Sequence, residues 1–228
     1  MPGYETELQK ERDMKDKFMA QHPESPFIIG DVAGFTGLRY FPIDPKYRVP
    51  AVLQRMERPP EAVLRTNRDG QLTCRYIGDM HFELDGQNYA LRVFHAGEQV
   101  GLSVFIPFRD STSGKGSYAP GRYLMLQLTE EDEYTLDFNL AFNPYCAYTE
   151  RYECGYPPPE NDLPTPIQAG EMAWSAPTGP EPAPVAVSSA PHPPRRPAPK
   201  TPRAAARVRS KVPRTKPRRA PPKRSTRR

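Results

Sequence analysis

The sequence predicts a mainly β domain, an antiparallel barrel or sandwich of about eight strands with an N-terminal amphipathic helix, a long ordered cover loop and a disordered C-terminal tail. Three observations lead to this prediction. Short runs rich in β-branched and aromatic residues fill the middle of the chain. In two places an Asp-Gly pair lies between two consecutive runs. The last aromatic residue of the chain is Trp174. We therefore expect residues 1–174 to form a single β-rich domain.

Residues 4–19 are expected to form the helix, and Pro23 to end it. Five apolar side chains fall within one arc of a 3.6-residue helix: Tyr4, Leu8, Met14, Phe18 and Met19. We expect this arc to dock on the rest of the domain. The alternative is a helix that binds a partner or a membrane surface, which its mixed rather than basic charges disfavour.

After an irregular packed segment at residues 27–45, the pattern becomes that of β-strands. Strands are expected at residues 48–56, 62–66, 72–77, 81–84, 87–95, 101–107, 123–128 and 134–138. Asp69-Gly70 and Asp85-Gly86 lie between short β-rich runs and predict hairpin turns. Beyond Phe138 the chain is rich in aromatic residues without a regular period, which predicts an ordered cover loop over the sheet.

Residues 175–228 are expected to be a disordered tail, because 14 of the 30 prolines lie there and apolar residues are too few to build a core. The distribution of charged residues divides the chain into the same two parts. The first 190 residues hold 17 basic and 27 acidic residues, a net charge of −10, whereas residues 195–228 carry 15 basic residues and no acidic one. Such a tail could contact nucleic acid without reading its sequence, or fold back on the acidic domain.

The N-terminus is charged and lacks the apolar core of a signal peptide, and no later run is long and apolar enough to span a membrane. These features predict a cytoplasmic protein without a membrane partner. The three cysteines are an odd number without a Cys-x-x-Cys pair, which favours reduced thiols over a disulfide framework.

Polar residues are unusually dense between Phe105 and Glu171. Polar groups in an apolar frame need partners, so this stretch predicts a buried network or a binding site. The candidate ligand-binding residues are Arg109, Asp110, Thr112, Tyr118, Arg122, Asp137, Asn139, Asn143, Cys146, Tyr148, Asn161 and Glu171. Their function is expected to be the binding of a small anionic or polar molecule between the hairpin at residues 105–123 and the loop at residues 137–171.

Two arginines and a glycine-bearing loop suit such a molecule, because forked guanidinium donors and backbone N–H groups match a carboxylate or phosphate. The guanidinium groups of Arg109 and Arg122 would supply these donors. The alternative is a purely structural hairpin, in which Asp110 and Thr112 bond their own backbone and Arg109 or Arg122 pairs with Asp137. The sequence leaves both open.

A hydrolase is the alternative function. Asp110, Asp137 or Glu171 would then act as general acid or base, with Cys146 as a nucleophile. The chain lacks a P-loop and a Gly-x-Ser-x-Gly motif. The sequence leaves open whether the protein is an enzyme.

No cofactor is predicted. Asp137 and Asn139 offer oxygen ligands for Mg²⁺ or Ca²⁺, but without a defined spacing. Cys146 and Cys154 could complete a zinc site with His81 and His95. The two alternatives to a zinc site are that the cysteines pack as inert buried side chains, which is the commoner outcome, and that Cys146 is reactive.

Several motifs are shared with a known family. They are Gly37-Leu-Arg-Tyr-Phe-Pro, Phe105-Ile-Pro-Phe-Arg-Asp-Ser-Thr-Ser-Gly, Gly121-Arg-Tyr, Asp137-Phe-Asn, Asn143-Pro-Tyr-Cys-Ala-Tyr, Pro158-Pro-Glu-Asn and Ile167-Gln-Ala-Gly-Glu. On the basis of these motifs, residues 4–172 closely resemble the prokaryotic family called domain of unknown function 1684. The family typically has Asn-Pro-Pro-Cys and Cys-Pro where this chain has Asn143-Pro-Tyr-Cys and Cys154-Gly. The resemblance supports one domain and implies no activity.

Overall fold

The computed structural model describes residues 2–27, 35–96 and 102–175. By its internal contacts the chain divides into two units, residues 1–183 and 184–228, and the described residues all lie in the first. The predicted tail, including its candidate nucleic-acid segment at residues 195–228, lies outside the described residues.

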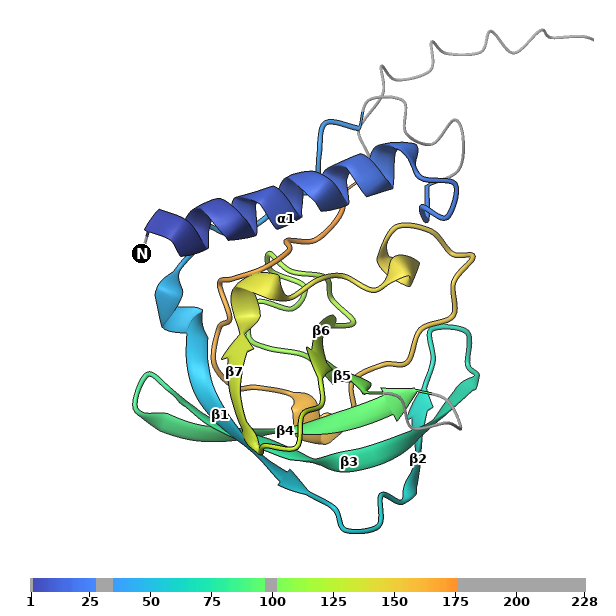
Figure 1. The fold of residues 1–228 in the computed structure, drawn as a ribbon. Coiled ribbons are helices and arrows are strands. Elements are labelled where there is room, and N and C mark those ends of the chain that lie inside the picture. The colour runs from blue at the N-terminus through green and yellow to red at the C-terminus, as the bar shows by residue number, and fades with distance from the viewer. Residues whose placement is uncertain (1, 28–34, 97–101, 176–228) are drawn as a thin grey trace, which may run out of the picture. The chain divides into compact units, whose positions relative to one another are not determined.

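The N-terminal helix, α1 (Pro2–Gln21), forms as predicted (Figure 1). Its buried face includes Leu8, Arg12 and Met19, which follow one another at helical spacing. Met14 is 61% exposed, contrary to its expected place in the buried arc. Six residues on from Leu8, it lies about 120° around the helix, so it faces away from the domain. A buried arginine takes part in the docking face instead.

In the described part of the chain, seven strands form one antiparallel sheet. They are β1 (Arg48–Arg55), β2 (Glu61–Arg65), β3 (Gln71–Leu84), β4 (Gln87–Ala96), β5 (Ser103–Phe108), β6 (Arg122–Gln127) and β7 (Glu133–Asp137). Their order is β6-β5-β4-β3-β1-β7, and β2 pairs with β3 outside this path. The sheet curls into a half-barrel (Figure 1), which confirms the prediction of a mainly β, antiparallel fold.

Two predicted strands, 72–77 and 81–84, are in fact the two halves of β3. The register against β4 shifts between Tyr76 and Gly78, which marks a bulge within the strand. A Cβ on Gly78 would lie 2.2 Å from the backbone oxygen of Gln54 on the neighbouring β1. The bulge therefore brings two backbones close together, and Gly78, which lies between the two predicted strands, permits a continuous bent strand.

Both predicted hairpin turns are present. Asp69-Gly70 joins β2 to β3, and Asp85-Gly86 joins β3 to β4. Asp69 and Asp85 have positive φ angles of 56° and 50°, a conformation that aspartate tolerates better than most residues.

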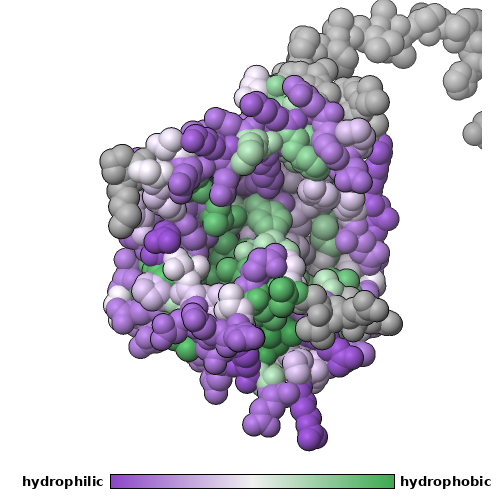
Figure 2. All heavy atoms as spheres, in the orientation of Figure 1, coloured by the Kyte–Doolittle hydropathy of each residue, from purple (hydrophilic) through white to green (hydrophobic). Residues whose placement is uncertain are grey.

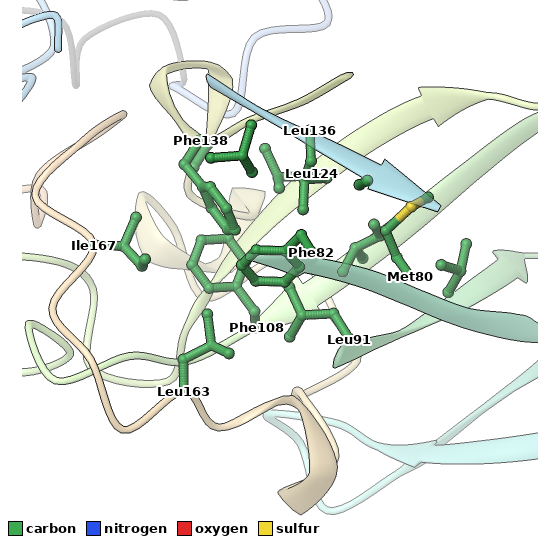
Figure 3. Packing of buried hydrophobic residues seen from close by; sticks show 14 of the residues in the cluster. Met80, Phe82, Leu91, Phe108, Leu124, Leu136, Phe138, Leu163 and Ile167 are labelled. Carbon is green, nitrogen blue, oxygen red and sulfur yellow. The ribbon is translucent and has the colours of Figure 1, made fainter. Parts of the chain in front are cut away.

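The main core lies on the concave side of the sheet. Along β1, Val49, Ala51 and Leu53 alternate with exposed residues, as expected for a strand with one buried face. Figure 3 shows Phe82, Phe108 and Phe138 packed against one another, with Leu163 and Ile167 of the cover loop beside them. The core therefore joins the sheet to the segment that follows β7.

The segment from Phe138 to Ser175 forms the predicted cover, with short 3-10 turns at Phe138–Leu140 (η2), Tyr145–Ala147 (η3) and Pro159–Asn161 (η4). Backbone bridges fix it to other parts of the domain, including Tyr40 with Glu171 and Tyr123 with Phe142. Figure 1 shows this yellow-to-orange segment between α1 and the strands β3 and β4. Among the described residues, no helix is long and apolar enough to cross a membrane.

Candidate functional site

Arg122 and Asp110 form a buried ion pair. Arg122 begins β6, is 0% exposed, and its Nη2 lies 2.9 Å from Asp110 Oδ2. The same guanidinium donates to the carbonyl oxygens of Ile167 (2.9 Å), Glu171 (3.1 Å) and Ala169. Burial lowers the pKa of Arg122, and the Asp110 carboxylate opposes that shift. This arginine ties the end of the cover segment to the sheet.

The other oxygen of Asp110 is also occupied by protein donors. Oδ1 accepts from the backbone N–H of Thr112 (2.8 Å), the Thr112 hydroxyl (2.6 Å) and the backbone N–H of Ile167 (3.1 Å). Thr112 Oγ1 also lies 2.8 Å from Ser117 Oγ. The hairpin loop therefore organises its own backbone around Asp110, as in the structural alternative, but Arg122 pairs with Asp110 rather than Asp137, which lies 3.8 Å from Arg48 instead.

Asp137 and Asn139 brace the beginning of the cover segment. Asp137 accepts from the Tyr4 hydroxyl of α1 (2.6 Å) and from the backbone N–H of Asn139 (2.9 Å). Asn139 makes paired hydrogen bonds with the backbone of Asp44, at 3.1 Å to its N and 2.9 Å to its O. Burial and the Asp137 carboxylate raise the pKa of Tyr4.

Asn161 and Arg109 lie where η4 meets the end of β5, and the Arg109 N–H donates to the Asn161 carbonyl at 2.9 Å. Asn161 is 0% exposed and joins the backbone of Arg92 (2.7 and 3.0 Å) to that of Pro107 (2.7 Å). Arg109 is partly exposed, donates to the Ala119 carbonyl (2.7 Å) and lies 3.6 Å from Asp162.

Glu171 connects the cover segment to the helix. Its side chain is 1% exposed and accepts from Lys15 of α1, from the Tyr148 hydroxyl (2.5 Å) and from the backbone N–H of Asn143 (2.8 Å). Burial and this carboxylate raise the pKa of Tyr148 well above its ordinary value. Asn143 donates to the Met172 carbonyl (2.8 Å), while its buried Oδ1 has no partner. Tyr118 contacts Cys146, as described below.

A cavity of about 160 Å³ lies between α1 and the cover segment. This is close to the about 150 Å³ of an engineered cavity that accepts benzene. Its wall combines apolar and polar residues from the helix, the approach to the sheet and the cover: Leu8, Glu11, Arg12, Lys15, Tyr40, Asn139, Leu140, Ala141, Phe142 and Glu171. On the face shown in Figure 2, apolar surface gathers in the recess between the hydrophilic helix and the sheet.

Two residues of the cavity wall, Arg12 and Tyr40, carry buried donors without a partner in the described part of the chain. Arg12 is 8% exposed, donates from Nη1 to the Phe41 carbonyl (3.3 Å), and stacks on the Tyr40 ring at 4.3 Å. Among the residues that the structure describes, Arg12 Nε and Nη2 and the Tyr40 hydroxyl have no hydrogen-bond partner. Within the described residues Arg12 forms no ion pair, and burial lowers its pKa. A buried cation with free donors is costly unless something binds it.

Two of the twelve predicted site residues, Asn139 and Glu171, line this cavity. The other ten do not, and most of them hold backbone together elsewhere in the domain; whether they bind a ligand stays a prediction. Sequence reasoning missed Arg12, Lys15 and Tyr40. The helical spacing of Arg12 between Leu8 and Met19 is a signal for its burial, but an apolar arc alone does not include an arginine.

No group of three or more His, Cys, Asp or Glu side chains suited to a metal occurs in the described part of the chain. Cys146 and Cys154 are close to each other, whereas His81 is hydrogen-bonded to Gln54 on β1.

Comparison with known proteins gives a family and a fold. The family described as "Protein of unknown function (DUF1684)" matches residues 33–172, so its match begins after α1. A solution NMR structure of the uncharacterized protein from gene locus rrnAC0354 of Haloarcula marismortui is 40% identical, with a TM-score of 0.60. It aligns with 75% of this chain and 95% of its own. No curated protein matches.

Proposed function

Since the chain belongs to the family described as "Protein of unknown function (DUF1684)", whose description assigns no activity, we propose a function from the site: the protein binds a small anionic molecule in the cavity between α1 and the cover segment. One observation carries the proposal. Arg12 is buried against this cavity with two guanidinium nitrogens unpartnered. A carboxylate or phosphate oxygen would satisfy them with charge-assisted hydrogen bonds.

The surroundings of Arg12 favour an anion with an apolar portion. The Tyr40 hydroxyl is a further free donor in the same wall. Glu171, the buried carboxylate of the cavity wall, already binds Lys15, Tyr148 and the Asn143 backbone, so its repulsion of an anion is reduced. Leu8, Ala141 and Phe142 supply the apolar part of the wall. The cavity volume suits a ligand of about the size of one benzene ring.

The hydrolase alternative stays an untested prediction. Each of its three carboxylates, Asp110, Asp137 and Glu171, is already bound by protein donors. A general acid or base needs hydrogen-bond access to its substrate. The site geometry therefore supports binding more directly than it supports catalysis.

Thermal unfolding of the full chain with a panel of small carboxylates and phosphates tests the proposal. At least one compound should raise the unfolding temperature in a concentration-dependent way, because a ligand that binds only the folded state stabilises it. Arg12→Gln should abolish that rise. Lys17→Gln removes the same charge from an exposed position on the same helix and should retain it.

The proposal fails if no compound in the panel shifts the wild-type protein, or if Arg12→Gln and Lys17→Gln respond alike. Unfolding without ligand shows that each variant is folded. Arg12→Met, which keeps the stem of the side chain, should unfold at the same or a higher temperature than wild type, because it removes a buried cation that the protein does not pair.

A further inference from the structure

Two of the three cysteines lie together on the cover segment. Cys146 is in η3 and Cys154 lies eight residues later; both are half-buried, and the Cys146 thiol hydrogen-bonds to Cys154. Cys74 is different. It is 2% exposed on β3, and its thiol donates to the Ala62 carbonyl at 3.5 Å. The chain therefore holds one half-buried thiol pair and one buried thiol that serves as an internal comparison.

Contacts from the folded sheet hold both cysteines in place. The Asn67 side chain accepts from the Cys154 backbone N–H at 2.8 Å, and the Asn67 N–H donates to the Cys154 carbonyl at 3.3 Å. Tyr123 of β6 donates to the carbonyl of the next residue, Gly155. The Tyr118 hydroxyl lies 3.4 Å from the Cys146 carbonyl and 3.9 Å from its Sγ. The meeting of the two thiols is therefore a fixed part of the fold.

The two sulfurs are not equivalent. Cys154 Sγ accepts from the Cys146 thiol and from the backbone N–H groups of Cys146 and Tyr145, which together lower the pKa of Cys154 to about 7. The same thiol contact, with burial, raises the pKa of Cys146. Of the two thiols, Cys154 is therefore the more readily deprotonated. The other ionisable groups that face the pair are Tyr118, Tyr123, Glu153 and Tyr156.

We propose that Cys154 and Cys146 form a reversible, peroxide-reactive dithiol site, with Cys154 as the attacking sulfur and Cys146 as the resolving one. The Cys154 thiolate attacks one oxygen of a hydroperoxide and breaks the O–O bond, which gives a sulfenic acid and releases hydroxide, or alkoxide from an organic peroxide. The Cys146 sulfur then attacks Cys154 Sγ and forms the S–S bond. Its proton leaves with the displaced hydroxide as water, so the peroxide gains the two electrons that the thiols lose.

Oxidation of the reduced full chain with hydrogen peroxide, in the absence of other thiols, tests the site. The number of titratable thiols in the unfolded product should fall from three to one, and peptide mass analysis should show one cross-link between the Cys146 and Cys154 peptides that dithiothreitol reverses. Cys74 should remain a free thiol. The initial rate should increase as pH rises through about 7 and level off above it, because deprotonation of Cys154 produces the attacking species.

Variants separate the two roles. In Cys146→Ser, peroxide should leave a sulfenic acid on Cys154 that dimedone traps. Cys154→Ser should react with peroxide at least tenfold more slowly than wild type. Cys74→Ser should react with peroxide like wild type. The site is refuted if wild type forms no Cys146–Cys154 cross-link, if cross-links form only between molecules, or if Cys154→Ser reacts as fast as wild type. Because this experiment needs no ligand, its result is independent of the anion cavity.

Discussion

At the scale of single residues, two buried arginines differ in how the protein satisfies them. Arg122 has an aspartate and three carbonyl oxygens as acceptors, whereas Arg12 has one carbonyl and an aromatic ring. Arg122 has an ion-pair partner and lacks an acceptor at Nε alone, whereas Arg12 has no ion pair among the described residues and lacks acceptors at both Nε and Nη2, so the burial of Arg12 is the less compensated. This difference assigns Arg122 to the support of the fold and makes Arg12 the candidate for a ligand.

Arg122→Met is expected to destabilise the protein strongly. It leaves the Asp110 carboxylate buried without its counter-ion and three carbonyl oxygens without their donor, for which a loss of about 3–5 kcal/mol in the free energy of unfolding is typical. Urea denaturation measures this loss.

Arg109→Met is the matched control on the same hairpin. Arg109 is partly exposed and 3.6 Å from Asp162, so its loss should cost less than about 1 kcal/mol. Equal effects of the two substitutions would contradict the structural role assigned to Arg122.

At the scale of elements, the bulge in β3 explains how one strand can serve the whole sheet. β3 pairs with β1, β2 and β4, and its bend at Gly78 depends on close backbone contact with β1. A straight strand of this length would not curl the sheet enough to place the cover segment over its concave face.

Gly78→Ala should therefore destabilise the protein by about 1–3 kcal/mol, as is usual when an added methyl group forces the backbone to shift. The new Cβ would lie 2.2 Å from the Gln54 backbone oxygen. Gly3→Ala adds the same methyl group to the exposed first turn of α1, where nothing lies within 4 Å, and should be neutral or slightly stabilising. Thermal unfolding compares the two, and a neutral Gly78→Ala would refute the close contact.

Sequence reasoning found the elements better than the site. Local signals sufficed for the helix, the hairpins and most strands, because the Asp-Gly turns and the alternation along β1 arise from neighbouring residues. The sequence predicts two strands on either side of Gly78 where the structure has one, because glycine is common both in a bulge within a strand and in a loop between strands. It could not identify the cavity, because Arg12, Tyr40 and Glu171 meet only through the docking of α1 on the cover segment.

At the scale of the whole molecule, charge separates an acidic body from a basic tail. Residues 195–228 carry 15 basic residues and no acidic one. We propose that this segment binds nucleic acid through phosphate contacts, with an affinity that falls steeply as salt rises. The tail would then act independently of the anion cavity.

Deleting residues 185–228 should abolish retention on immobilised double-stranded DNA at low salt, which wild type should show and lose on raising the salt concentration. The deletion variant should keep the ligand-dependent thermal shift, because the cavity belongs to residues 8–171. Retention that is unchanged by the deletion would refute the role of the tail.

The central claim is that Arg12 is the anchor of an anion in the cavity beneath α1. A crystal structure of the full chain with the carboxylate or phosphate that gives the largest thermal shift tests it most directly. The account predicts ligand oxygens about 2.7–2.9 Å from Arg12 Nε and Nη2. A ligand bound elsewhere, with both nitrogens of Arg12 still unpartnered or occupied only by water, would contradict it.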